Sequence, residues 1–106
     1  MKRMEEATLL VITNGKDKDG FPQKIENRFP VFVTERSATR MEFYEALRTG
    51  IKISLVLELR IEDWEQSNHI VDGKKAYATK VEYDGGTYDI VRSYRTNLSM
   101  IQISCS

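Results

Sequence analysis

Residues 51–62 alternate between apolar and polar side chains at all but one position. Every odd position from 51 to 61 is Ile or Leu, and the even positions are polar or charged, with Val56 as the exception. A period of two puts alternate side chains on the two faces of a β-strand, whereas a helix would spread them around its circumference. The pattern predicts a strand that would span about 40 Å at ~3.3 Å per residue. A strand that long must bend or serve two sheets, as strands do in small antiparallel barrels.

Apolar segments on either side of this stretch predict five more strands. Residues 7–14 form the first, and residues 24–35 form the second, in which Pro30 marks a sheet edge or a bulge because it cannot donate to a ladder. Residues 76–94 contain a hairpin of two strands. Residues 98–105 form the last strand, in which the apolar phase changes between Met100 and Ile101, as a bulge would require.

The hairpin at 76–94 turns at Asp84-Gly85-Gly86, and this sequence allows two registers. One is an Asp84-Gly85 turn, and the other is a Gly85-Gly86 turn that would set Tyr83 opposite Tyr88. Both registers place the apolar side chains of the hairpin on one face. We favour the second register because it forms a direct aromatic pair across the strands.

One short helix is predicted over residues 39–48. Thr39 and Glu42 have the spacing of a capping box, and Gly50 follows the last turn. Apolar side chains lie on one face of this helix, which suits a plug for an open end of a barrel. The predicted fold is mainly all-β, a single domain over residues 1–106. It is a small antiparallel β-barrel of about six strands with one short α-helix inserted between strands 2 and 3.

Two polar connections are candidate contact surfaces. Residues 14–23 predict an exposed hairpin loop, because Gly15, Gly20 and Pro22 favour turns. Residues 63–75 are long for a connection in a small domain, and such connections are usually functional or disordered. Trp64 within them packs either against its own barrel or against a partner, and both alternatives stay open. The candidate partner-contact residues are Lys16, Asp17, Asp19, Phe21, Trp64, Asn68, His69 and Ile70.

Charge and composition narrow the classes of function. Among 106 residues, sixteen Lys and Arg balance sixteen Asp and Glu, so net charge attracts neither nucleic acid nor an anionic membrane. No apolar run is long enough for a bilayer span or a signal peptide, and we expect a protein made and kept, or assembled, in the cytoplasm. The single cysteine, Cys105, excludes an internal disulfide and a cysteine-based zinc site. We expect Cys105 to be a small buried hydrophobe.

Candidate catalytic and metal-binding residues form no recognisable motif. His69 is the only histidine, and no nucleophile motif lies near it in sequence. Glu58 and Glu62 share one face of the predicted strand, which we interpret as its solvated side. Asp17 and Asp19 resemble a calcium loop only faintly, because the remaining ligand positions do not match. We therefore expect no catalytic residue, no cofactor and no metal site.

The residues alone favour a soluble, non-catalytic β-barrel that binds protein. A second class of function is a small barrel that binds single-stranded nucleic acid on aromatic stacking platforms. Balanced charge argues against this class, and the hairpin aromatics are more simply part of the core. The stacking candidates would be Trp64, Tyr77, Tyr83 and Tyr88.

Several short segments follow one another in a distinctive order. They are an opening strand, the sequence DGFP at 19–22, the sequence EFYEA at 42–46, a strand that ends near Leu59 and Arg60, and the hairpin YDGGTYDI at 83–90. Their order and spacing resemble the head-tail joining, or head-closure, proteins of long-tailed phages. The resemblance covers nearly the whole chain, from about Thr8 to Cys105.

This resemblance implies a structural virion protein of the phage neck and not an enzyme. It implies a dodecameric ring beneath the portal or adaptor that closes the DNA channel after packaging and offers the tail a docking surface. The implied partners are the portal or adaptor, tail-completion proteins and further copies of the same chain. DNA would be present only as the content of the channel, and no membrane is involved. The implied location is the virion neck, after assembly in the host cytoplasm.

Overall fold

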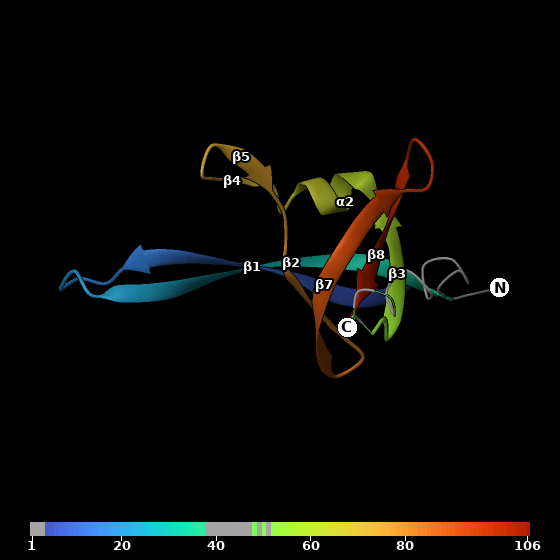
Figure 1. Cartoon of the computed structure of the whole chain (residues 1–106), viewed down its shortest axis with the longest axis horizontal. Coiled ribbons are helices and arrows are strands. Elements are labelled where there is room, and N and C mark those ends of the chain that lie inside the picture. The colour runs from blue at the N-terminus through green and yellow to red at the C-terminus, as the bar shows by residue number, and fades with distance from the viewer. Residues whose placement is uncertain (1–3, 38–47, 49, 51) are drawn as a thin grey trace.

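A computed structural model describes residues 4–37, 48, 50 and 52–106. In these residues six strands close an antiparallel barrel in the order β1-β2-β3-β8-β7-β6, and β4 and β5 form a separate hairpin (Figure 1). The predicted class, a mainly all-β barrel of about six strands, is confirmed. The helix predicted over 39–48 lies outside the described residues, apart from Arg48.

From residue 55 on, the described elements follow one another with short connections. None of the helices in the described ranges is both long and apolar enough to cross a membrane. The elements are β1 (Glu5–Lys16), β2 (Pro22–Arg36), β3 (Leu55–Arg60), α2 (Ile61–Glu65), β4 (His69–Val71), β5 (Lys74–Ala76), β6 (Lys80–Tyr83), β7 (Gly86–Arg95) and β8 (Met100–Cys105).

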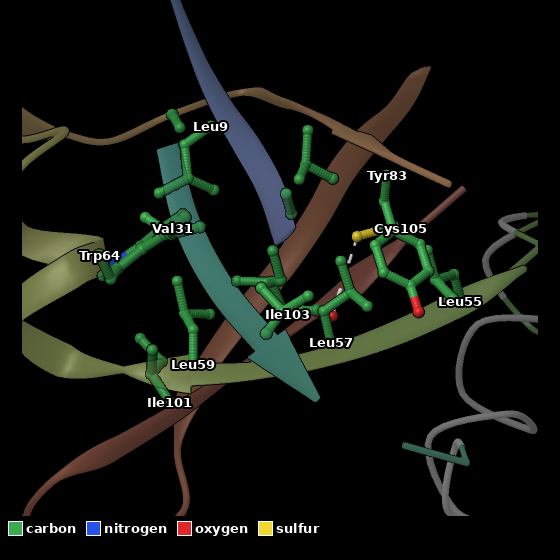
Figure 2. Close-up of a cluster of buried hydrophobic side chains, with 14 of the residues drawn as sticks. Leu9, Val31, Leu55, Leu57, Leu59, Trp64, Tyr83, Ile101, Ile103 and Cys105 are labelled. Atoms are coloured by element: carbon green, nitrogen blue, oxygen red, sulfur yellow. Dashed lines mark hydrogen bonds between the residues drawn. The ribbon is translucent and has the colours of Figure 1, made fainter. Parts of the chain in front are cut away.

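The barrel interior is filled by aliphatic side chains with one aromatic residue near each end. Trp64 lies at one end of the cluster and Tyr83 at the other (Figure 2). Cys105 is fully buried among them, and burial raises the pKa of its thiol to about 12, which confirms the prediction of a small buried hydrophobe. The cluster contains Ala7, Leu9, Val11, Val31, Val33, Leu55, Leu57, Leu59, Trp64, Ala78, Val81, Tyr83, Ile101, Ile103 and Cys105.

The predicted long strand over 51–62 is shorter than expected. β3 contains only Leu55–Arg60, because the chain turns into α2 at Ile61. The Ile61 N–H still donates to the carbonyl of Ser99 at 2.9 Å, in the register of the β3–β8 pairs, so the ladder ends where α2 begins. Val56, which breaks the alternation, is buried on the face of β3 opposite the core cluster. The strands that run far beyond the barrel are β1 and β2.

The turn between β6 and β7 uses Asp84 and Gly85, so the register favoured from the sequence is wrong. Tyr83 lies opposite Gly86, and Val81 lies opposite Tyr88. Asp84 and Gly85 have φ of 48° and 80°, which are the positive values that a type I′ turn requires at both central residues. Aspartate tolerates this conformation, so a second glycine is not needed in the turn.

The predicted bulge in the last strand is also misplaced. β8 pairs with β3 without a shift, and the irregularity lies in β7, between Ile90 and Arg92. Leu98, the first apolar residue of the predicted strand, belongs to the preceding turn, and its side chain is 96% exposed. The Asn97 carboxamide oxygen holds this turn by accepting the N–H groups of Ser99 and Met100 at 2.8 and 2.9 Å.

Glu58 joins β3 to both neighbouring strands. Its carboxylate accepts hydrogen bonds from Arg36 of β2 at 2.9 Å and from Gln102 of β8 at 3.2 Å. Its side chain is only 13% exposed, so the interpretation of Glu58 as a solvated residue is wrong. Burial raises the pKa of this carboxyl group, but the bonds from Arg36 and Gln102 outweigh burial and leave the pKa below its ordinary value.

We expect Glu58 to make the barrel less stable in acid. Because its pKa is lower in the folded protein than in the unfolded chain, the ionised form stabilises the fold above the ordinary value of 4.5. This stabilisation is lost as the pH falls below that value, through the folded pKa. Urea unfolding at about pH 7 and about pH 3 should show a smaller loss for Glu58→Gln than for the unchanged protein. Equal losses in the two proteins would contradict the assignment.

Candidate binding surface

β1 and β2 leave the barrel together as a two-stranded arm. β1 pairs with β6 only at residues 7–10, and β2 pairs with β3 only at residues 34–36. Beyond the barrel the two strands pair only with each other, out to Lys16 opposite Pro22 (Figure 1). We define residues 12–28 as the arm. In the part of the chain that the structure describes, neither outer edge of the arm has a partner strand.

The tip of the arm is an ordered turn at residues 17–21. The Asp17 carboxylate accepts the N–H groups of Asp19 and Phe21, both at 2.9 Å, and Gly20 has a φ of +82°. The turn holds the Phe21 side chain 65% exposed. The predicted exposed loop at 14–23 is therefore a hairpin tip, shortened because strand pairing extends to Lys16. Four predicted contact residues, Lys16, Asp17, Asp19 and Phe21, lie together there.

The arm has an apolar side chain that covers a glycine. Ile25 lies over Gly15, so closely that a Cβ atom at Gly15 would come within 2.4 Å of the Ile25 side chain. The absence of a side chain at Gly15 thus lets Ile25 pack across the ribbon, although Ile25 stays partly exposed. Ile12 and Ile25 were not predicted to lie at the surface, because apolar residues within a predicted strand are usually buried in the core.

The segment 63–75 is not the unstructured connection that the sequence predicts. It forms α2, β4 and β5, and Asp72 and Gly73 make a turn with φ of 53° and 78°. Figure 1 shows the β4–β5 hairpin projecting from the barrel on the same side as the arm. Ile70 on this hairpin is 70% exposed.

Trp64 belongs to the core and not to a contact surface. Its side chain is 4% exposed and stacks on Tyr77, with ring centroids 5.3 Å apart and an interplanar angle of 14°. Of the two alternatives, packing against its own barrel is correct. The signal in the sequence was the spacing of Ile61 and Trp64, which places both residues on one face of a helix turn.

Polar contacts fix the end of α2 to the segment between β5 and β6. The buried Ser67 hydroxyl donates to the Trp64 carbonyl at 2.8 Å and accepts the Ala78 N–H at 3.1 Å. The Glu65 carboxylate accepts a hydrogen bond from the Tyr77 hydroxyl at 3.1 Å. These bonds lock Trp64 in place, so the segment cannot be removed without opening the core.

The other two predicted contact residues are held by this region. Asn68 donates from its side-chain amide to Glu65 at 3.3 Å, and its side chain is exposed. His69 is partly buried, with Nδ1 2.9 Å from the carbonyl oxygen of Ser67. No group of three His, Cys, Asp or Glu side chains within the described ranges lies close enough to hold a metal ion.

A second surface, the acidic end, lies where β1 begins and β6 turns into β7. It is an open concavity of about 430 Å³ whose lining includes Glu6, Glu82 and Asp84. Glu82 forms an ion pair with Arg28 of β2. Burial and the nearby charges of Glu35, Glu5 and Asp84 together raise the pKa of Tyr83, which lines the concavity, to about 12. The sequence did not predict this cluster, because its residues come from strands far apart in the chain.

Comparisons with protein families, with curated proteins and with solved structures find no match to this chain.

Proposed function

We propose that this protein is a structural component of the neck of a long-tailed phage that joins the DNA-filled head to the tail. It forms a ring under the portal or adaptor and closes the DNA channel. The order of segments from DGFP at 19–22 to YDGGTYDI at 83–90 supports the family. The observation that carries the proposal is the arm, which projects from a small barrel with both edges open and apolar side chains exposed.

Such an arm suits assembly better than catalysis. An unpaired strand edge is a template for strand addition by another chain, and an isolated protein exposes such an edge at a risk of aggregation. The arm carries charges along β2, at Lys24, Glu26 and Arg28, which limit unwanted pairing. A protein that functions in a ring has a partner for the edge in the assembled state.

Inactivation of the gene in the phage or prophage that encodes the chain tests this function. We expect lysates to contain filled or leaking heads and separate tails, and expression of the unchanged chain in trans should restore joined particles. Tailed, infectious particles at normal yield in the absence of the protein would overturn the proposal. A coding sequence with no phage structural genes near it would count against the proposed neck function before any experiment.

The alternative, binding of single-stranded nucleic acid, makes a different prediction. Of its stacking candidates, Trp64 and Tyr83 are buried, and Tyr77 and Tyr88 pack against the core cluster. With these rings occupied and with a formal net charge of +0, we expect no appreciable binding to short single-stranded DNA or RNA at physiological salt. Fluorescence anisotropy of a labelled oligonucleotide measures this. A sub-micromolar affinity that weakens steeply with added salt would favour the alternative.

A further inference from the structure

The outer face of β1 carries opposite charges at its two ends. Residues directly opposite each other in an antiparallel pair share a face, as do residues two apart in a strand. Lys16 and Lys24 therefore lie on this face at the tip of the arm, and Glu6 lies on it at the acidic end. The tip also holds Asp17 and Asp19, but the lysines at 16, 18 and 24 outnumber them.

These opposite charges cannot meet within one molecule. From Glu6 to Lys16 the strand covers about 33 Å at ~3.3 Å per residue. Charges in physiological salt are screened over roughly 8 Å. Within the described residues Glu6, Lys16 and Lys24 form no ion pair. Pairing of the two ends therefore requires two copies of the chain.

Each end also presents an aromatic side chain to solvent. Phe21 lies at the tip, and Phe32 lies directly opposite Glu6 on the outer face with its side chain 53% exposed. Exposed aromatic residues surrounded by charge are typical of the centres of protein interfaces. The two ends thus carry opposite charges, and each exposes an aromatic side chain that a contact would bury.

We infer that the arm tip of one copy docks head to tail on the acidic end of a second copy. Lys16 and Lys24 of the arm then face Glu6 and Asp84, and Phe21 becomes buried near the concavity. Because the two contacting surfaces differ, each copy keeps a free arm or a free acidic end for the next copy. Such a contact builds a ring when the rotation from one copy to the next closes on itself. The inference rests on the proposed neck function and adds to it the surfaces that join neighbouring subunits.

Chemical cross-linking tests the contact in the full-length chain. Asp19→Cys places a thiol at the tip, and Thr8→Cys places one in the concavity, while the native Cys105 is buried. With both substitutions in one chain, a short bis-maleimide should give a ladder of covalent oligomers larger than dimers. Each single variant alone should give no ladder. Only monomers, or dimers alone, from the double variant would overturn the head-to-tail arrangement.

Charge reversal tests the recognition itself. Lys16→Glu with Lys24→Glu in the cysteine pair should reduce the ladder by at least about tenfold, and so should Glu6→Lys with Thr87→Lys. Mixing the two reversed chains should restore cross-linking, because the acidic arm of one now matches the basic end of the other. Lys52→Glu with Arg95→Glu is the control of equal charge change, and it should leave the ladder unchanged. Loss without restoration in the mixture would contradict pairing of these two surfaces.

The two proposals can fail separately. If gene inactivation leaves heads joined to tails but the charge-dependent ladder forms, the neck function is wrong and the head-to-tail contact stands. If inactivation blocks joining but the chain with Lys16→Glu and Lys24→Glu restores infectivity fully, the neck function stands and this contact is wrong.

Discussion

Replacement of Trp64 by alanine should lower the free energy of unfolding by about 3–5 kcal/mol. The side chain fills one end of the barrel and stacks on Tyr77, so its removal leaves a cavity that the surrounding strands cannot collapse into. Small domains have a total stability of roughly 5–15 kcal/mol, so this loss would be a large fraction of the total. Chemical denaturation followed by circular dichroism measures the change.

Phe21→Ala is the matched control for this prediction. It also removes a large aromatic side chain, but one that is largely exposed at the arm tip, so its effect should stay within about 0.5 kcal/mol. Comparable losses for Trp64→Ala and Phe21→Ala would mean that the tip belongs to the cooperative core. A small loss for both would mean that Trp64 does not close the barrel.

Shortening of the arm should abolish the joining of phage heads to phage tails, while the barrel stays folded. In the proposed variant an Asn-Gly turn replaces residues 14–24 and connects Thr13 to Ile25, which already lie opposite each other. None of the removed side chains is buried, so the free energy of unfolding should change by less than about 1 kcal/mol. Joining should fall to the level of gene inactivation, because the tip that reaches a neighbouring protein is gone. Complementation of an inactivated phage by the shortened gene, scored as infectious particles, measures this.

A conservative change in the other projecting hairpin controls for non-specific effects. Asp72→Asn keeps a residue that tolerates the positive φ of the β4–β5 turn, so both stability and joining should stay normal. Normal joining by the shortened chain would show that the arm is dispensable. Strong destabilisation of the shortened chain would show that the arm contributes to the core, and the binding surface would then have to be sought elsewhere.

The alternation in the sequence predicted the class of fold because it reports which side chains avoid water, and it failed where the same pattern fits two structures. Ile61 continues the alternation of 51–59, yet it starts α2, since Ile61 and Trp64 are also spaced for one face of a helix. The predicted β6–β7 register was wrong because it favoured a cross-strand pair of tyrosines over the backbone preferences of the turn residues. Local turn geometry at Asp84 and Gly85 decided it.

The candidate surface was only partly predictable for a similar reason. Polarity and turn residues identified the arm tip correctly, because Asp17, Gly20 and their neighbours define a local hairpin. The acidic end could not be predicted, since Glu6 and Glu82 are brought together by pairing of β1 with β6 across most of the chain. Trp64 was ambiguous because sequence alone does not show which side of a polar segment faces the core.

A cryo-electron microscopy reconstruction of the neck of purified particles tests most directly whether this barrel is a ring-forming part of the phage neck. The result expected is a ring of copies of this barrel between the portal and the tail, with each arm reaching the adjacent copy. Purified, infectious particles that lack the chain altogether, or a neck whose density cannot hold this barrel, would contradict the claim.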